Sequence, residues 1–399
     1  MSKRKAGIIG LGNRGMSLLE HVILALSDYC DVTAVCDVYE DRMMDAKKII
    51  MDKGQKEPLM TKDYKELIDS DIVDTVFVFS SWETHSEMAI YAMNAKKAVA
   101  IEVGGVYNID ECYRMVEAYE RTKTPFMFLE NCCFGRREMM ALNMVQKGVF
   151  GEIVHCSGGY CHDLRHEVSH GRELRHYRLD NYLNRNCENY PTHELGPISK
   201  VLNINHGNRL LSLVSVASKS AGLHDYINLN KSDDEVLKNA KFAQGDIITT
   251  IIKCANGETI TITLDTTLPR FYSRGFTVRG TRGMYEEATD SVFLDSNGDN
   301  EHDFDWRETQ SGNAKNYEDE YDHPVWKKYI EDGVQGTHDG MDWLEFKTFF
   351  ECLKNNEPMP VDVYDAATWM SITALSEQSI TTGLPVAIPD FTKGKWIKG

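Results

Sequence analysis

A glycine-rich turn near the start of the chain constrains its fold more than any other feature. Gly10, Gly12 and Gly15 follow a short apolar run and precede an amphipathic segment, in the pattern G-x-G-x-x-G. In a strand–turn–helix unit, the first glycine permits a tight turn and the second admits a pyrophosphate close to the backbone. The third lets helix and strand pack closely. The spacing therefore predicts that the chain opens with a parallel α/β unit that binds a dinucleotide.

An acidic residue at the appropriate distance supports this interpretation. The apolar run at 32–36 ends directly before Asp37, roughly 20 residues beyond the turn, where a carboxylate binds the ribose hydroxyls of the nucleotide. A carboxylate in this place would repel a 2′-phosphate. The sequence therefore predicts NAD, rather than NADP, as the cofactor.

The first 130 residues alternate between short apolar runs and segments with helical periodicity, which is typical of a parallel sheet covered on both faces. The expected strands are 5–10, 31–36, 75–79, 98–101 and 126–129, and the expected helices are 14–27, 39–53, 84–95 and 109–122. Ligands bind beyond the carboxyl ends of the strands in such sheets. Candidate cofactor contacts therefore follow those ends, at 10–15, Asp37, 80–85, Glu102 and 130–131.

After about residue 150 the β-branched runs are no longer separated by helices. Runs at 151–161, 210–220, 246–253, 258–265 and 274–280 predict a largely antiparallel sheet, with a hairpin at Asn256-Gly257. We expect an α/β protein of two domains, a doubly wound Rossmann domain at 1–130 and an α+β substrate-binding domain at 131–399. Two closing helices within 340–381 are expected to pack back toward the first domain. The polar, acidic stretch at about 295–323 is expected to be a solvated loop.

Composition limits the classes of partner. The net charge of −17 would repel nucleic acid and anionic membranes, and no run approaches the ~18 apolar residues of a membrane span. The ten cysteines are scattered without a C-x-x-C pair, and the N-terminus lacks an apolar signal segment. We therefore expect a cytoplasmic protein that acts on a small molecule. An exposed sheet face in the second domain would suit subunit pairing, so a homo-oligomer is expected.

The richest polar region lies between Glu130 and Glu194 and allows several chemistries. Histidines and cysteines there could ligate zinc, and His162, His166 and His170 recur at four-residue spacing. However, no pair of ligand doublets has zinc-finger spacing and H-E-x-x-H is absent, so no metal is expected. Two carboxylates could act as a hydrolytic pair, but the sequence places no two of them at the required separation. A Ser-His-Asp triad would lack its G-x-S-x-G turn.

Several motifs resemble one family across nearly the whole chain. They are Ser80-Ser-Trp-Glu-Thr-His85, Glu102-Val103, Glu130-Asn131, Gly159-Tyr160 with His162-Asp-Leu-Arg165, Tyr190-Pro-Thr-His193, Leu268-Pro-Arg with Tyr272, and His338-Asp-Gly-Met-Asp342. With the glycine turn, they resemble the Gfo/Idh/MocA superfamily of sugar-handling NAD(P) proteins. Within it the chain most resembles glycoside hydrolase family 109, the NAD-dependent α-N-acetylgalactosaminidases. The most specific motif is Tyr190-Pro-Thr-His193 followed by Leu195-Gly-Pro197.

One position separates this branch from the dehydrogenases of the superfamily. Those enzymes carry Glu-Lys-Pro after the fourth strand, with the lysine as the acid–base group, whereas this chain has Glu102-Val103-Gly104. Valine cannot exchange a proton, so a sugar oxidoreductase that uses this lysine is disfavoured, and the glycosidase branch resembles this chain in having valine. The chain departs from that branch at Gly104, where proline is expected, and at Glu194, where glycine is expected.

The resemblance implies a glycoside hydrolase that works through a transient oxidation. The sugar is oxidised at C3, which acidifies its C2 proton, and the C1 leaving group then departs by elimination. Water adds back at C1, and C3 is reduced again. NAD is regenerated in each cycle and can stay tightly bound.

The resemblance also implies a set of site residues. Besides Gly10 and Gly12 of the turn, NAD would be held by Asn13, Arg14, Asp37, Trp82, Glu83, Thr84, His85, Glu102, Val103, Asn131 and Tyr190. The sugar would meet Tyr160, Arg178, Tyr190, Pro191, Thr192, His193 and Tyr272.

Three of these side chains are candidate catalytic groups. Histidine titrates near neutral pH, so His193 could accept the proton of the C3 hydroxyl. Tyr160 could remove the C2 proton if its pKa of about 10 fell, which a nearby Arg178 or His193 would favour. Glu130 could assist the leaving group or orient a neighbour. Two other functions stay open, an NAD-dependent sugar oxidoreductase in which another group replaces the lysine, and a non-catalytic NAD-binding protein.

Overall fold

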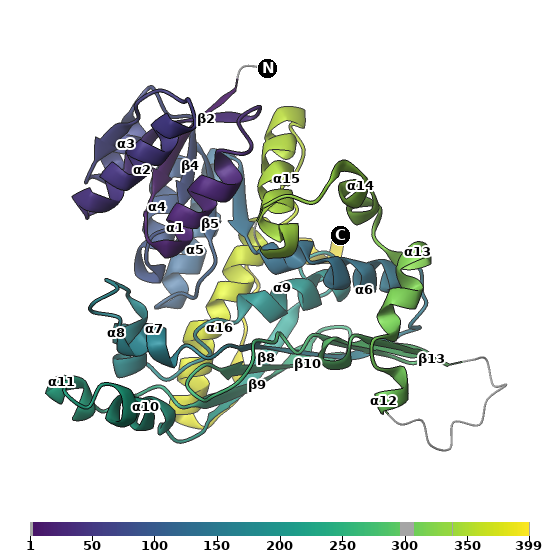
Figure 1. Cartoon of the computed structure of the whole chain (residues 1–399). Coiled ribbons are helices and arrows are strands. Elements are labelled where there is room, and N and C mark those ends of the chain that lie inside the picture. The colour runs from purple at the N-terminus through teal and green to yellow at the C-terminus, as the bar shows by residue number, and fades with distance from the viewer. Residues whose placement is uncertain (1–2, 296–306, 337, 399) are drawn as a thin grey trace. The chain divides into compact units, whose positions relative to one another are not determined.

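The computed structural model describes residues 3–295, 307–336 and 338–398, and it divides into two compact units. Unit 1 comprises Met1–Phe134 and Gly333–Ala367, and unit 2 comprises Gly135–Asp332 and Thr368–Gly399. In Figure 1 both units combine a sheet with helices. Both are assembled from segments that lie far apart in the sequence.

Unit 1 contains a six-stranded parallel sheet with the order β3-β2-β1-β4-β5-β6. Its strands are β1 (Arg4–Ile9), β2 (Cys30–Cys36), β3 (Leu59–Thr61), β4 (Thr75–Val78), β5 (Ala98–Glu102) and β6 (Phe126–Leu129). Every residue of β4, β5 and β6 is buried, as expected for strands covered by helices on both faces. The strand order reverses between β1 and β4, which is where a doubly wound sheet binds its ligand.

The helices of unit 1 alternate with these strands, as the periodicity predicts. They are α1 (Asn13–Leu18), which continues as the π-helical turn η1 (Leu19–Ile23), α2 (Glu40–Asp52), α3 (Tyr64–Asp69), α4 (Trp82–Asn94), α5 (Ile109–Thr122) and the short η2 (Asn131–Phe134). A capping box starts α5, because Asn108 accepts from the Glu111 amide and the Glu111 carboxylate accepts from the Asn108 amide.

The second segment of unit 1 adds aromatic side chains to its core. The short η5 (His338–Gly340) leads into α15 (Met341–Asn355), and α16 (Val363–Thr382) begins in this unit. Phe77 of β4 packs against Phe346, Phe349 and Phe350 of α15, with ring centroids 5.3, 5.5 and 5.9 Å away. Burial of each ring contributes roughly 1.5–3 kcal/mol, so α15 is an integral part of the core of unit 1.

Unit 2 contains an eight-stranded mixed sheet with the order β13-β12-β11-β7-β10-β9-β8-β14. Its strands are β7 (Ile153–Cys161), β8 (Leu210–Ala217), β9 (Ile247–Cys254), β10 (Thr259–Asp265), β11 (Thr277–Gly280), β12 (Gly283–Glu286), β13 (Ser291–Leu294) and β14 (Val386–Ala387). Among these strands, β7 and β10 pair in parallel and all other neighbours are antiparallel. The predicted hairpin is confirmed, and Gly257 at its turn has a φ of +110°, which glycine adopts readily.

The helices of unit 2 are mostly short. They are α6 (Arg136–Gln146), α7 (Arg165–Ser169), α8 (Arg178–Asn184), α9 (Thr192–Val201), α10 (Gly222–Asn230), α11 (Glu235–Lys238), η3 (Glu287–Thr289), α12 (Arg307–Gln310), η4 (Asn313–Tyr317), α13 (Glu318–Tyr321), α14 (Pro324–Asp332) and η6 (Lys395–Lys398), with most of α16. Several of the predicted sugar contacts lie where these helices begin. Arg178 is the first residue of α8, and Thr192 is the first residue of α9.

The prediction of a loop at about 295–323 was wrong where the structure describes this stretch. Its residues from 307 onward form α12, η4 and α13. Glu318 pairs with Arg136 and Arg137 of α6 at 2.8 Å, so acidic side chains that the composition assigned to solvent bind α6 instead. Residues 296–306 lie outside the described residues.

The predicted fold class is confirmed, with a parallel Rossmann sheet followed by a largely antiparallel one. The predicted strands of the first 130 residues are found within about one residue of their expected limits.

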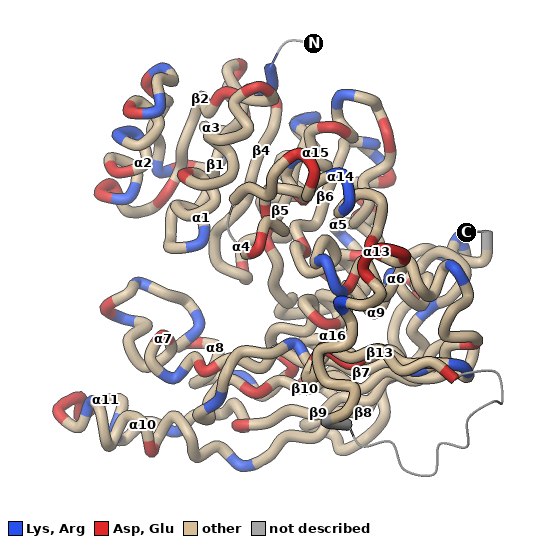
Figure 2. Tube along the Cα trace, turned by 45° about the vertical axis from the view of Figure 1, so that its right-hand side comes forward, with Lys and Arg blue, Asp and Glu red and all other residues tan. Residues whose placement is uncertain are grey.

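Asp and Glu residues are interspersed with Lys and Arg over the helices of both units (Figure 2). Within the part of the chain that the structure describes, no helix has both the length and the apolar character needed to cross a bilayer.

Candidate functional site

The glycine turn of unit 1 joins β1 to α1 and packs closely against neighbouring backbone. Gly10 has a φ of +93°, and a Cβ on it would lie 2.6 Å from the carbonyl carbon of Phe79 and from the amide nitrogen of Ser80. A Cβ on Gly15 would lie 2.1 Å from the Gly10 oxygen. By contrast, a Cβ on Gly12 would have a single neighbour within 4 Å, Arg42 Nη1 at 3.8 Å. The turn is therefore closed behind Gly10 and Gly15 and open at Gly12, as the dinucleotide motif requires.

Asp37 lies directly after β2 and is bonded to this turn. The Leu11 amide donates to Asp37 Oδ2 at 2.7 Å, and the Tyr39 amide donates to Oδ1 at 2.9 Å. Arg42 Nη1 lies 3.8 Å from Oδ2. Because each carboxylate oxygen can accept a second hydrogen bond, the fixed and 93% buried Asp37 side chain retains capacity for a pair of hydroxyls.

The segment from Trp82 to His85 forms the first turn of α4, after β4. His85 is buried and its Nε2 lies 2.9 Å from the Ser80 carbonyl oxygen. Burial lowers the pKa of His85 to about 4, so the ring is neutral at neutral pH. A Cβ on Gly104 would lie 2.3 Å from Trp82 Cδ1. The buried Trp82 ring therefore occupies the space that a proline at position 104 would need, which gives a physical reason for this departure from the family pattern.

A partly buried ion-pair network connects the ends of β5 and β6 with the glycine turn. Arg14 Nε donates to Glu102 Oε1 at 2.7 Å, and its two terminal nitrogens donate to the carboxylate of Asp342 at 2.7 and 2.9 Å. Asn131 Nδ2 donates to the same carboxylate at 2.7 Å. Burial alone would raise the pKa of Asp342, but hydrogen bonds from His338 and Arg14 hold that pKa well below its usual range. Asp342 is therefore an anion.

Glu345 lies one helical turn beyond Asp342 and behaves differently. It is fully buried, and neither carboxyl oxygen has a hydrogen-bond partner within the described ranges. Burial, and then the charges of Asp342 and Glu102, raise the pKa of Glu345 well above its usual value. The neutral carboxyl is therefore the favoured form.

Glu130, the candidate leaving-group acid, also belongs to unit 1. It is fully buried directly after β6, and its Oε1 accepts from the Cys132 amide at 3.1 Å. All predicted cofactor contacts lie in unit 1 except Tyr190, and all of these unit 1 residues lie at or after the carboxyl ends of parallel strands. The structure thus gathers the predicted nucleotide residues at one edge of one sheet.

The predicted sugar contacts of unit 2 form an aromatic cluster, which we define as Tyr160, Tyr190, His193 and Tyr272. The Tyr160 ring centroid lies 4.2 Å from that of Tyr190, 5.5 Å from that of His193 and 6.4 Å from that of Tyr272. Tyr190 and His193 are 4.8 Å apart. Tyr160 and Tyr190 are more than 90% buried, whereas Tyr272 is 47% exposed. The cluster therefore has a buried base and an accessible rim.

Arg178 supplies a cation to this cluster. Its guanidinium carbon lies 5.2 Å from the Tyr190 ring centroid, and its Nη1 lies 3.2 Å from Glu167 Oε1. Burial opposes the charge of Arg178, but the neighbouring Tyr160 and Glu167 raise its pKa well above the usual value. A cation beside phenol groups favours their ionised form. Pro191 and Thr192 are buried at the start of α9 and carry the backbone from Tyr190 to His193.

His162 is a neighbour of the aromatic cluster that the sequence-based prediction did not include. Its Nδ1 lies 3.0 Å from the hydroxyl of Tyr160, and its ring centroid lies 5.2 Å from that of Tyr272. Burial and then the charge of Arg178 lower the pKa of His162, so its imidazole is neutral at neutral pH. His166 and His170 stack on each other with centroids 4.1 Å apart, and within the described part of unit 2 they form no metal cluster with His162.

Glu188 is a buried acid two residues before Tyr190, and Glu188→Gln is expected to flatten the pH dependence of stability. Burial raises the pKa of Glu188 from 4.5 to about 8. The unfolded chain ionises near the lower value while the folded chain stays protonated, so stability falls as the pH rises from about 4.5 to about 8. Glutamine cannot ionise, so the variant should gain up to a few kcal/mol relative to wild type over this range. Urea unfolding at about pH 5 and about pH 8 measures the difference, and parallel curves would contradict it.

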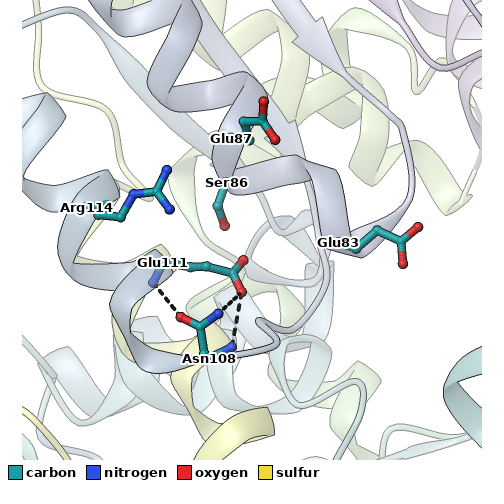
Figure 3. A pocket seen from close by; sticks show the side chains of 6 residues that line it. All are labelled: Glu83, Ser86, Glu87, Asn108, Glu111 and Arg114. Atoms are coloured by element: carbon teal, nitrogen blue, oxygen red, sulfur yellow. Dashed lines mark hydrogen bonds between the residues drawn. The ribbon is translucent and has the colours of Figure 1, made fainter. Parts of the chain in front are cut away.

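A polar surface pocket of about 190 Å³ lies between α4 and α5. Figure 3 shows the six side chains that line it, Glu83, Ser86, Glu87, Asn108, Glu111 and Arg114. Glu111 is bonded to Asn108 in the capping box, and Glu83 points away from the others. A lining of carboxylates with one guanidinium and no apolar wall is not typical of a dinucleotide or sugar site.

The chain matches two family models. Residues 134–398 match the model described as glycosyl hydrolase 109, C-terminal domain. Residues 4–129 match the oxidoreductase family, NAD-binding Rossmann fold.

Curated proteins are similar to the chain over nearly its full length. A glycosyl hydrolase family 109 protein of Stenotrophomonas maltophilia is 36% identical over 419 residues, which cover 99% of this chain and 90% of that protein. The alpha-N-acetylgalactosaminidase of Tannerella forsythia is 35% identical over 415 residues, which cover 98% and 86%.

Solved structures share the fold at lower identity. A levoglucosan dehydrogenase in complex with NADH and levoglucosan has a TM-score of 0.71 at 16% identity and covers 97% of this chain and 100% of its own. The myo-inositol 2-dehydrogenase from Lactobacillus plantarum has a TM-score of 0.68 at 17% identity, with the same coverage. These likenesses show the fold alone.

Proposed function

This chain belongs to glycosyl hydrolase family 109, and from that premise we propose that it hydrolyses α-N-acetylgalactosaminides with the help of bound NAD. The observation that carries the proposal is the convergence of Tyr160, Tyr190 and His193 beside the largely buried guanidinium of Arg178. Two phenols, an imidazole and a cation supply proton-transferring groups and hydrogen bonds for a polyhydroxylated substrate. The relative named alpha-N-acetylgalactosaminidase supports the choice of sugar.

The residues of unit 1 fit NAD as the cofactor. The open backbone at Gly12 admits a pyrophosphate, and the fixed carboxylate of Asp37 suits the ribose hydroxyls. When bound, the oxidised nicotinamide ring supplies a reversible hydride acceptor for a sugar carbon. The residues that would hold it are Gly10, Gly12, Asn13, Arg14, Asp37, Trp82, Glu83, Thr84, His85, Glu102, Val103, Asn131 and Tyr190.

His193 accepts the proton of the sugar C3 hydroxyl while that carbon is oxidised, and it returns the proton when the carbon is reduced. Its ring packs edge-on against Tyr160 and Tyr190, at interplanar angles of 72° and 88°. Two fixed contacts of this kind hold the imidazole in one orientation. Val103, in place of the lysine of the related dehydrogenases, leaves this proton transfer to His193.

Tyr160 removes the C2 proton of the oxidised sugar through its phenolic oxygen. The Tyr160 hydroxyl lies within hydrogen-bond distance of Nδ1 of the neutral His162, at 3.0 Å, and the Arg178 cation stabilises negative charge on the phenol oxygen. Glu130 protonates the leaving group at C1. Each such group contributes roughly 10²–10⁴ in rate.

The reaction is tested with a nitrophenyl α-N-acetylgalactosaminide in deuterated water. We expect release of nitrophenol without added cofactor, no accumulation of NADH, and deuterium at C2 of the released sugar, because proton removal at C2 exposes the carbanion to solvent. The β-anomer and the non-acetylated α-galactoside serve as matched controls for the substrate.

Three outcomes would contradict the proposal in different ways. A released sugar without deuterium would exclude the elimination route. Steady accumulation of NADH would identify a sugar oxidoreductase. Binding of NAD with no change in any glycoside of a broad panel would identify a non-catalytic NAD-binding protein.

We further propose a cytoplasmic location and a homo-oligomer. All ten cysteines are free thiols, and nine of them are buried, which suits a reducing compartment. The outward-facing side of β8 and β9 carries Val216 and Ile251, which are 66% and 49% exposed. Such apolar exposure on a sheet face supports pairing with a second copy, and light scattering after gel filtration measures the assembled mass.

A further inference from the structure

Asp342 binds several side chains at the nucleotide edge of unit 1. Its carboxylate is fully buried and accepts from both terminal nitrogens of Arg14 and from Nδ2 of Asn131. The Nδ1 atom of His338 lies 2.7 Å from Asp342 Oδ2. One carboxylate therefore binds side chains from three segments of the chain.

Two of these partners are predicted cofactor contacts. Arg14 lies in the glycine turn, 328 residues from Asp342 in the sequence, and Asn131 starts η2 after β6, 211 residues away. Arg14 also donates Nε to Glu102, which ends β5. Through Arg14 and Asn131, Asp342 fixes the side chains that follow β1, β5 and β6.

The cation of Arg14 offsets the negative charges of this network. Arg14 lies between the carboxylates of Glu102 and Asp342 and neutralises part of their negative charge. Glu345, the next acid on α15, favours its neutral form. Without Arg14 in place, two buried carboxylates would repel an anionic dinucleotide at this edge.

The turn at His338–Gly340, directly before the helix that carries Asp342, has an unusual backbone conformation. His338, Asp339 and Gly340 have φ values of +50°, +53° and +87° in succession. Left-handed backbone at residues other than glycine is unfavourable and persists only where surrounding contacts hold it. Here the contact of His338 with Asp342 spans that turn. The turn and the network therefore support each other.

We propose that Asp342 is a positioning residue that makes NAD a retained cofactor rather than an exchanging one. This inference rests on the proposed function, in which NAD is regenerated in every turnover and need not leave. Asp342 holds Arg14 and Asn131 in the arrangement that receives the nucleotide, so little ordering remains to be done when it binds. Preorganisation of this kind lowers the dissociation constant.

The test is the NAD affinity of Asp342→Asn, measured by calorimetry in the absence of sugar. Asparagine keeps the shape but loses the negative charge and one acceptor oxygen. Oδ1 can still accept from Arg14 and Asn131, but the second Arg14 bond and the His338 contact, both at Oδ2, lose their acceptor. We expect NAD affinity to fall about 30-fold or more. The purified variant should contain less NAD than wild type, and its hydrolysis should require added NAD while kcat at saturating NAD stays within about 3-fold of wild type. A merely structural role would lower kcat without this requirement.

Asp339→Asn is the matched control, because Asp339 is exposed in the same turn and asparagine also tolerates a positive φ. It should bind NAD as wild type does. If Asp342→Asn does not fold, His338→Ala removes an exposed partner and should weaken NAD binding roughly 2- to 10-fold.

Wild-type affinity for NAD in Asp342→Asn, or in His338→Ala where the first variant does not fold, would overturn the inference and leave the proposed function intact. A wild-type chain that binds no NAD would overturn both. These outcomes are distinguishable because binding is measured without hydrolysis.

Discussion

Replacing His193 with alanine is expected to lower kcat for an α-N-acetylgalactosaminide by roughly 10²–10⁴, while the NAD content of the protein stays unchanged. The imidazole packs against Tyr160 and Tyr190 and is the group proposed to move the C3 hydroxyl proton. The nucleotide turn is built from other residues, at Gly10 to Gly15 of unit 1. Steady-state kinetics, with absorbance spectra of the released nucleotide, measure both quantities.

His224→Ala provides the control for this variant. His224 is exposed on α10, outside the aromatic cluster, so its removal should change neither the rate nor the NAD content. If His193→Ala folds, retains NAD and hydrolyses at the wild-type rate, the proposed role of His193 is wrong.

Replacing Gly10 with alanine is expected to abolish useful NAD binding, with a loss of affinity on the order of 100-fold or more. The new Cβ would combine a φ of +93° with contacts of 2.6 Å to the backbone of Phe79 and Ser80. Since both neighbours are backbone atoms, either the turn after β1 or the connection between β4 and α4 must move, and the nucleotide residues that follow them move too. Calorimetric titration with NAD measures the effect, and urea unfolding reports the accompanying loss of stability.

Gly54→Ala is a control that distinguishes the effect of a positive φ from the effect of a steric clash with neighbouring backbone atoms. Gly54 has a similar φ of +80°, but nothing lies within 4 Å of a Cβ placed there. We expect this control to lose only about 1–2 kcal/mol of stability and no NAD affinity. Equal NAD binding in the Gly10 and Gly54 variants would show that the close turn is not needed for the cofactor.

Much of the fold could be predicted because each long element carries its own periodic signal. The buried strands of unit 1 and the hairpin at Gly257 are examples, since local turn chemistry and apolar runs define them. The strands β3, β12, β13 and β14 are two to four residues long and only partly buried, so they lack the continuous apolar run that marks the equally short β4 and β6. Glu318 was misjudged because its arginine partners lie 181 and 182 residues away in the sequence.

The candidate site likewise contains residues that the local sequence predicts and residues that it does not. The rule that ligands bind at the carboxyl ends of parallel strands predicted Asp37, Glu102 and Asn131 from local sequence. The motif His338-Asp-Gly-Met-Asp342 predicts no role for Asp342, because that role depends on contacts with Arg14 and Asn131 that no local pattern encodes. His162 could have been found, since it lies two residues after Tyr160, close to the end of β7, and alternate strand residues share a face.

The division of unit 1 into two chain segments has a consequence during protein synthesis. Phe77 leaves the ribosome well before Phe346, Phe349 and Phe350, the rings that pack against it. At ordinary translation speeds this interval is on the order of tens of seconds. Throughout that time the apolar face of the nascent sheet is not yet covered by α15. Chaperones should therefore bind most to growing chains that are stalled before α15 emerges.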